Sequence, residues 1–310
     1  MKVSLYSTKR YFMRTYTLVH DLKVFGMRVE SFPAGIGDAF SAIMQRLPNG
    51  QSRSYYGLST MDANGKVLYY ATAEEKSPGE ASQYGYETYT IEKGRYLTET
   101  VYDWRSKTDT IKDVFHGMMQ DKSADDTKPC VEWYKDDNEM VCMLQMDAKK
   151  ELFAAVDDAT AALMELLLPL SEEQINSIPF KDSWTAAQLA VHVTKSNNAI
   201  VQAMDMQGKM PGRNATDRVA ELKSVFLDFN NKLKSPEFIV PKPGEYEKEK
   251  LLATFKKSND QLRQKRDRVN LAEAINFPAF GEITRIELFH FVLYHTQRHI
   301  HQLKNMLRYL

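Results

Sequence analysis

The 310-residue chain has only two cysteines, Cys130 and Cys142, and no apolar run long enough to cross a membrane. Two cysteines exclude a disulfide framework, and we expect both to be buried free thiols in a reducing compartment. The longest apolar run, residues 159–170, is interrupted by Glu165 and falls well short of the roughly 20 residues of a membrane span. The N-terminal residues include no apolar segment typical of a signal peptide. These absences predict a cytoplasmic protein without a membrane partner.

The sequence also lacks an excess of either charge, because 41 basic residues balance 41 acidic ones. The most basic segment, residues 256–268, carries mixed charges and reads as the solvated face of a helix. Residues 1–20 are too few for a DNA-reading module. We therefore expect no nucleic-acid partner. Dinucleotide-binding, P-loop and nucleophile-elbow motifs are missing as well, so the sequence assigns no catalytic residue.

The two halves of the chain differ in composition and in the periodicity of their apolar residues. The length of the chain fits two domains of about 150 residues. Residues 1–147 hold most of the tyrosines and 10 of the 14 glycines, and they alternate like strands. Residues 148–310 show helical periodicity nearly throughout and hold five of the seven histidines. We predict an N-terminal α+β domain and a C-terminal all-α domain, with little linker between them.

An internal repeat organises the first half. A strand, an amphipathic helix and a strand hairpin occur twice, and the apolar positions of the two helices are 71 residues apart. The first hairpin turns at Asn64-Gly65, a pair that tolerates positive φ. The expected elements are 25–32, 38–47, 54–60 and 66–72, followed by 94–104, 109–119, 130–135 and 139–145. This pattern predicts a pseudo-twofold domain with a groove between its repeats.

The duplicated layout and the strand Val131-Glu132-Trp133-Tyr134 resemble the GyrI-like small-molecule-binding domain over residues 20–147. The resemblance implies a groove that takes amphipathic or cationic small molecules. Glu132 and Tyr134 share one strand face by alternation and are the first candidates for ligand contact, because aromatic rings attract cations and a carboxylate orients them. Trp104, Tyr102 and Tyr56 are weaker candidates. The alternative is that these side chains only pack or solubilise the sheet.

The second half predicts four main helices, at 148–168, 184–207, 247–269 and 284–310. Pro169 ends the first helix, and a short helix follows Ser171, its expected N-cap. Ser183 is the expected cap of the next long helix. A further helical stretch at 217–234 and a proline-rich loop at 235–245 form one long crossover. An antiparallel four-helix bundle follows.

Three histidines of this half are expected to face the bundle interior. His295 and His299 lie four residues apart and stack on one helix face, and His192 lies on the apolar stripe of another helix. A single inward histidine is usually an ordinary core residue. Three of them each need a partner for a buried nitrogen, and one divalent metal ion satisfies all three. His290 and His301 are expected to face solvent.

These residues resemble the DinB-like superfamily of metal-binding four-helix bundles. The matching segments are Leu170 to Glu173, Asp182 to Thr185, Leu189 to His192, and His295 with His299, Gln302 and Leu303. The resemblance implies a divalent ion (nickel, zinc or iron) on the three histidines, with activities that include thiol transfer and hydrolysis. Arg298 departs from the pattern, since many members have a second histidine there. Gln302, Ser196 and Glu287 are candidates to orient the ligands.

Two functions remain open at the level of sequence. The first is a metal-dependent transferase or hydrolase that acts on a small molecule, with thiol-dependent chemistry included. The second is a non-catalytic sensor or sequestering protein with a structural metal. A homodimer is compatible with either. The metal, the substrate and the cooperation of the two domains do not follow from the residues.

Overall fold

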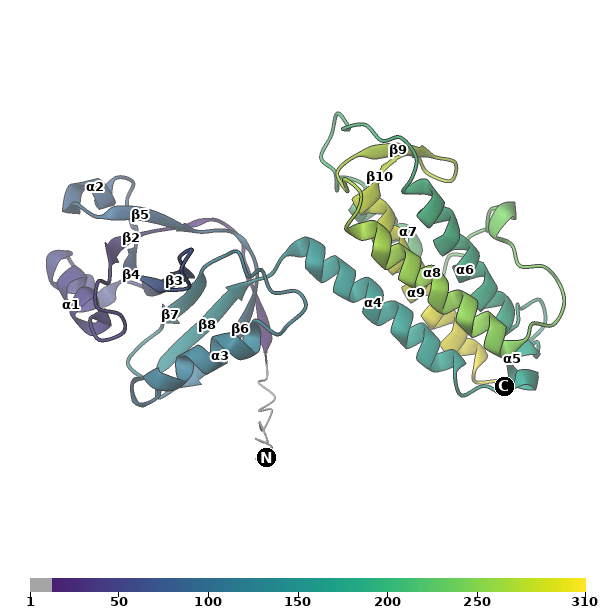
Figure 1. The fold of residues 1–310 in the computed structure, drawn as a ribbon, viewed down its shortest axis with the longest axis horizontal. Helices are drawn as coiled ribbons and strands as arrows, with labels where there is room; N and C mark the ends of the chain where they lie inside the picture. Colours follow the sequence, from purple (N-terminus) through teal and green to yellow (C-terminus); the bar gives the residue numbers. More distant parts are fainter. Residues whose placement is uncertain (1–12) are drawn as a thin grey trace. The chain divides into compact units, whose positions relative to one another are not determined.

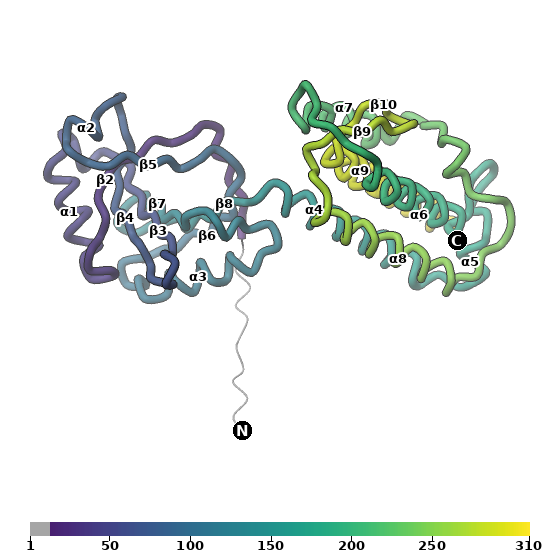
Figure 2. Tube along the Cα trace, turned by 45° about the horizontal axis from the view of Figure 1, so that its top comes forward, coloured from purple at the N-terminus to yellow at the C-terminus, as the bar shows by residue number. Residues whose placement is uncertain are grey.

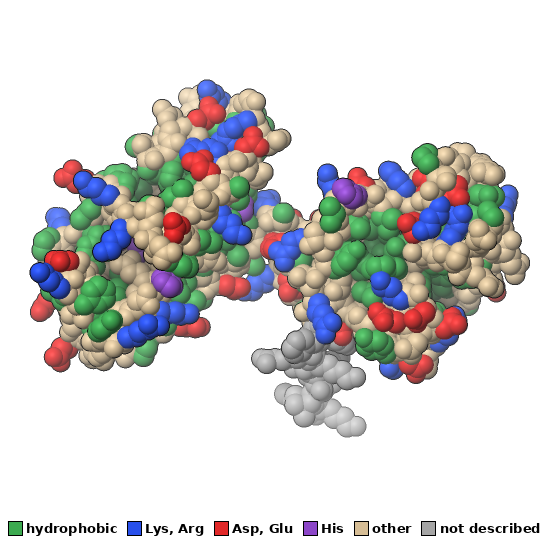
Figure 3. All heavy atoms as spheres, turned by 180° about the vertical axis from the view of Figure 1, so that it is seen from behind, with side chains coloured by type: hydrophobic (Ala, Val, Ile, Leu, Met, Phe, Trp, Pro, Cys, Tyr) green, Lys and Arg blue, Asp and Glu red, His purple; other side chains and the backbone are tan. Residues whose placement is uncertain are grey.

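The computed structural model describes residues 13–310 and divides into two compact units, between Glu151 and Leu152 (Figure 1). The sequence-based boundary at 147/148 lies four residues earlier, at the start of a helix. No helix among the described residues is long and apolar enough to cross a membrane. On the face in Figure 3, basic and acidic side chains are interspersed over each unit.

One antiparallel sheet of eight strands, in the order β1-β6-β8-β7-β3-β4-β2-β5, forms the first unit. The strands are β1 (Arg14–Leu18), β2 (Leu22–Arg28), β3 (Tyr55–Met61), β4 (Val67–Glu74), β5 (Glu87–Ile91), β6 (Gly94–Tyr102), β7 (Cys130–Tyr134) and β8 (Glu139–Gln145). Three helices accompany them: α1 (Ile36–Arg46), α2 (Glu80–Tyr84) and α3 (Ile111–Met118).

The strand order confirms the predicted repeat. β2-α1-β3-β4 and β6-α3-β7-β8 occupy symmetric places about the central β3–β7 pair. The repeats also exchange their outer strands, because β1 pairs with β6 and β5 pairs with β2. The strands β1 and β5 and the helix α2 were not predicted. The two repeats share one continuous sheet rather than contributing separate sheets.

Both faces of this sheet are apolar, but only one carries the repeat helices. On that face, α1 covers one apolar cluster that includes Phe25 and Tyr69, and α3 covers another that includes Met118 and Met140. Tyr134 packs against both clusters, at the junction of the repeats. Cys130 and Cys142 are buried free thiols on β7 and β8, as expected.

The second unit is a helical bundle. Its helices are α4 (Ala148–Leu167), α5 (Glu172–Asn176), α6 (Ala186–Ala203), α7 (Val219–Leu227), α8 (Lys248–Arg266) and α9 (Arg285–Met306). The crossover from α6 to α8 contains α7 and a single 3₁₀ turn, η4 (Glu237–Ile239). A short hairpin, β9 (Ala274–Phe277) with β10 (Gly281–Thr284), precedes α9 and was not predicted.

Capping boxes set where three of these helices begin. Ser171 caps α5 as expected, through reciprocal bonds with Gln174. The expected cap Ser183 is wrong, because Thr185 caps α6 through the same kind of pair with Gln188. Ser183 instead bonds the carbonyl of Trp184.

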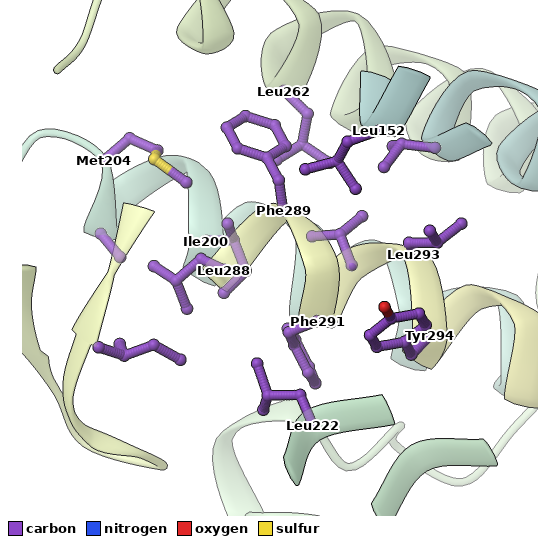
Figure 4. Close-up of a cluster of buried hydrophobic side chains, with 14 of the residues drawn as sticks. Leu152, Ile200, Met204, Leu222, Leu262, Leu288, Phe289, Phe291, Leu293 and Tyr294 are labelled. Carbon is purple, nitrogen blue, oxygen red and sulfur yellow. The ribbon is translucent and has the colours of Figure 1, made fainter. Parts of the chain in front are cut away.

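Packing inside the bundle joins α6 to both α8 and α9, and α7 to α9. α8 lies beside α4, where Arg263 pairs with Asp157 (Figure 2). Two apolar clusters fill the bundle. One gathers Ile200, Leu262 and Phe289 with neighbouring side chains (Figure 4), and the other gathers residues such as Leu163 and Phe255. The predicted four-helix bundle is therefore confirmed.

Candidate metal centre

The three predicted histidines converge inside the bundle, His192 from α6 and the other two from α9. All three are buried, with exposed fractions of 2% for His192, 5% for His295 and 6% for His299. One ligand nitrogen from each lies within 4.8 Å of the others. The i,i+4 spacing on α9 stacks two imidazoles on one face, and the packing of α6 against α9 brings the third to them.

Hydrogen bonds orient two of the three rings. His192 Nδ1 lies 3.1 Å from the carbonyl oxygen of Ile239, and His299 Nδ1 lies 3.0 Å from Gln302 Oε1. Because both partners can only accept, each Nδ1 carries the proton and each Nε2 presents a lone pair. The Nε2 atoms of His192 and His299 each lie 3.1 Å from His295 Nε2.

This arrangement fits a metal ion better than it fits the imidazoles alone. A proton on His295 Nε2 can serve only one of the two 3.1 Å contacts, which leaves a nitrogen lone pair without a donor. A divalent cation accepts all three lone pairs at once, and neutral imidazole is a common ligand for zinc, nickel and iron. The three histidines could therefore hold a metal ion.

Burial keeps these imidazoles neutral. Desolvation lowers the pKa of His192, lowers that of His295 well below its ordinary value, and lowers the pKa of His299 to about 3. The neighbouring histidines add to the effect for His295 and His299. Neutral imidazole is the form that binds a metal. Burial therefore keeps all three histidines in the metal-binding form near neutral pH.

Aromatic rings surround the triad. Trp184 lies 5.0 Å from the His192 ring, and Phe291 stacks on His295 at 5.0 Å. Phe226 of α7 meets His295 edge-on at 6.0 Å. The Ile239 carbonyl and Phe226 were not assigned to the site from the sequence. Trp184 lies in the segment Asp182 to Thr185 that carries the resemblance, and Phe291 lies four residues before His295, on the same face of α9.

Of the three residues expected to orient the ligands, only Gln302 contacts a triad imidazole through a hydrogen bond within residues 13–310. Ser196 is buried, but no hydrogen bond in that range joins it to the triad. The prediction that Glu287 orients a ligand is corrected by the structure. Glu287 caps α9 with Thr284 and forms a buried ion pair with Arg213 at 2.7 Å, so its oxygens are already used at the helix start.

Arg298, the departure from the family pattern, anchors the end of α7 beside the triad. Its guanidinium donates to the carbonyl oxygens of Phe226, Asp228 and Asn231. The Phe226 ring in turn touches His295. Arg298 thus fixes an aromatic wall of the centre in place of supplying a fourth imidazole.

A second buried polar cluster surrounds Glu132 in the first unit. The Tyr69 and Tyr134 hydroxyls donate to Glu132 Oε2 at 2.6 and 2.5 Å, and the two hydroxyl oxygens lie 3.0 Å apart. Burial raises the pKa of the Glu132 carboxyl, and the two tyrosine bonds oppose that rise. The paired residue on β3 is Gly57, where a Cβ would lie 1.9 Å from the Tyr69 hydroxyl oxygen. The missing side chain at Gly57 makes room for this cluster.

Aromatic rings from both repeats meet at the same place. Phe40 of α1 and Trp104 lie 5.1 and 4.9 Å from the Tyr134 ring. Two predicted ligand residues do not join them. Tyr56 belongs to the apolar cluster of the opposite sheet face, and Tyr102 at the end of β6 is 59% exposed.

Comparison with known protein families supports the DinB-like resemblance of the helical half. The family profile described as DinB superfamily matches residues 155–303. A DinB-like superfamily domain, of a kind that often binds metal, is therefore present in the second unit. A comparison with curated proteins finds no match.

Similar solved structures each cover about half of the chain. SAV2435 bound to tetraphenylphosphonium is 14% identical, covering 44% of this chain and 94% of its own, with a TM-score of 0.35. TT2238, a four-helix bundle protein, is 16% identical, covering 51% and 99%, with a TM-score of 0.34. An integron cassette protein of Vibrio cholerae is 16% identical, covering 44% and 95%, with a TM-score of 0.34.

Proposed function

We propose that the helical unit binds one divalent metal ion through the Nε2 atoms of His192, His295 and His299. The observation that carries the proposal is the pair of 3.1 Å contacts between imidazole nitrogens, with two of the rings held by acceptors at Nδ1. Buried lone pairs that face one another are costly without a cation between them.

Three neutral nitrogen ligands are typical of catalytic rather than closed structural metal sites. When bound, such an ion polarises a substrate oxygen or lowers the pKa of a bound water or thiol. The chain itself supplies the rigid ligand pair on α9, the closing ligand on α6, and an aromatic wall that limits water.

We therefore favour a metal-dependent transferase or hydrolase that acts on a small molecule, thiol transfer included. The alternative is a non-catalytic sensor or sequestering protein in which the metal only holds the bundle together. The two differ in whether the metal accepts an exogenous ligand.

Elemental mass spectrometry on the purified protein tests the proposal. We expect about one nickel, zinc or iron ion per chain, and none in a His192→Ala/His295→Ala double variant. His301→Ala, an exposed histidine on the same helix, is the matched control and keeps the metal. A protein that takes up none of the three metals, even when each is supplied, contradicts the proposal.

For the first unit, we propose that the Glu132 cluster binds an amphipathic cationic small molecule between the repeats. A buried carboxylate beside Tyr69, Tyr134, Phe40 and Trp104 supplies both charge and ring faces. The helix-bearing faces of both repeats meet there.

Calorimetric titration with tetraphenylphosphonium, a cation with four aromatic rings, tests this second proposal. We expect saturable binding in the wild type and at least tenfold weaker binding in Glu132→Gln, because the substitution removes the charge and keeps the shape. Glu99→Gln, on the same sheet face two strands away, is the control and retains binding. Equal affinity of Glu132→Gln and wild type contradicts this role.

A further inference from the structure

A buried polar layer crosses the helical bundle at the level of the histidine triad. On each of the four long helices, its members other than His192 fall in sequence between the residues of the two apolar clusters. Besides the histidines, its buried members include Thr160 on α4, Asn197 on α6, Ser258 and Asn259 on α8, and Thr296 on α9.

Most of these side chains have a partner within the protein. Asn197 Nδ2 donates to Asn259 Oδ1 at 2.8 Å. The hydroxyls of Ser258 and Thr160 donate to carbonyl oxygens of their own helices, at 2.7 and 2.9 Å. The layer is therefore largely closed on itself, as buried polar groups are expected to be.

Thr296 is the exception. It is 1% exposed, and its Oγ1 has no hydrogen-bond partner among residues 13–310. Two other buried side-chain atoms share this state, but each is the Nε of an arginine, Arg53 or Arg285, whose terminal nitrogens are bonded. Helical threonines elsewhere in the bundle, such as Thr194, bond the carbonyl four residues earlier, and Thr296 does not.

The position of Thr296 on α9 indicates where a partner for its hydroxyl would lie. Thr296 stands three residues before His299, so these two side chains are neighbours on one face of α9. Leaving a buried hydroxyl unbonded costs about 1–3 kcal/mol, so a partner from outside the protein is expected there.

We propose that the Thr296 hydroxyl donates a hydrogen bond to the exogenous ligand of the metal ion, a small anion or a substrate oxygen. The inference rests on the proposed metal centre and deepens it, because it makes Thr296 the residue that holds the non-protein ligand. The protein thus offers that ligand a donor as well as a cation.

Azide binding to the cobalt-substituted protein, followed by the visible absorption of Co²⁺, tests this role without relying on activity. Thr296→Val keeps the shape and removes the donor, and we expect roughly tenfold weaker azide binding. Thr296→Ser restores the donor and binds within about twofold of wild type. Thr160→Val, which removes a hydroxyl of the same layer on α4, is the matched control and leaves azide binding unchanged. Thr296→Ala replaces the valine variant if that variant fails to fold.

Cobalt content is measured first in every variant, so that two failures are told apart. A wild type that takes up no cobalt overturns the metal centre itself. A wild type that holds cobalt but binds no azide, or a Thr296→Val variant that binds azide as tightly as wild type, overturns the role of Thr296 and leaves the metal centre standing.

Discussion

The two units each bury a polar cluster, and the clusters differ in how they are satisfied. Around Glu132, two hydroxyl donors meet one carboxylate oxygen, so both donors have an acceptor within the protein. In the helical unit, three imidazole nitrogens approach one another with too few protons between them. Donor and acceptor counts thus separate a cluster that can be structural from one that could hold a cation.

The largest expected difference between the units is their response to metal. Free metal at about 1,000 times its Kd stabilises a single-site protein by roughly 4 kcal/mol. We expect this gain in the helical unit and none in the sheet. Hydrogen exchange followed by mass spectrometry reports each unit separately, by slower exchange in α6 and α9 and unchanged exchange in β3 and β7. Protection that persists in His295→Ala would contradict the assignment.

The support of His299 by Gln302 offers a finer test of the centre. Gln302→Leu removes the acceptor at Nδ1, and losses of this kind typically weaken metal binding about 10–100-fold. Asn305→Leu is the matched control, because it removes an amide beside the exposed His301 on the same helix. Competition with a chromophoric chelator measures both affinities. Equal losses in the two variants would mean that Gln302 acts only through helix stability.

A substitution at Gly57 tests how closely the cluster around Glu132 is packed. An alanine Cβ there would lie 1.9 Å from the Tyr69 hydroxyl and 2.9 Å from Glu132 Oε2. We expect Gly57→Ala to destabilise the sheet unit by about 1–3 kcal/mol and to leave metal content unchanged. Gly37→Ala on α1 meets no atom within 4 Å and is the control, with unchanged or slightly raised stability. Urea unfolding measures both, and equal stability of the two variants refutes the close packing.

The smallest expected difference between the units is their loss of folding stability in acid. The pKa of His299 is about 3 in the folded metal-free protein, below its ordinary value of about 6.5. The unfolded chain therefore binds the extra proton between these values, and stability present above pH 6.5 is lost as pH falls toward 3. From pH 7 to pH 5 we expect a loss on the order of 1–2 kcal/mol in the helical unit, and a smaller loss in His299→Leu. Unfolding of the metal-free protein at both pH values measures it, and equal slopes would refute the neutral, buried state of His299.

Local patterns in the sequence predicted the parts of the site that lie on one helix. The spacing of His295 and His299 places both imidazoles on one face, and the i,i+3 relation of Gln302 to His299 follows from the same geometry. The Ile239 carbonyl, 47 residues from His192, could not be predicted, because a backbone atom carries no signature in the sequence. The Thr185–Gln188 and Thr284–Glu287 pairs did carry a capping-box signature, which would have corrected the assignments of Ser183 and Glu287.

In the sheet, alternation placed Glu132 and Tyr134 on one face, and the repeat placed the hairpins. Pairing between strands distant in sequence decided the rest. Tyr69 reaches Glu132 only because β4 and β7 both flank β3, and the register that sets Gly57 opposite Glu132 turns Tyr56 to the other face. The exchange of β1 and β5 between repeats has no local signal either.

X-ray absorption at the edge of the bound metal tests the central claim most directly. Three imidazoles that meet through Nε2 predict about three nitrogen ligands, near 2.0–2.1 Å for zinc, with the scattering pattern of histidine rings. In His192→Ala the imidazole contribution should fall by a third. A first shell of sulfur, a shell of oxygen without imidazole scattering, or a spectrum unchanged by His192→Ala would contradict the centre formed by His192, His295 and His299.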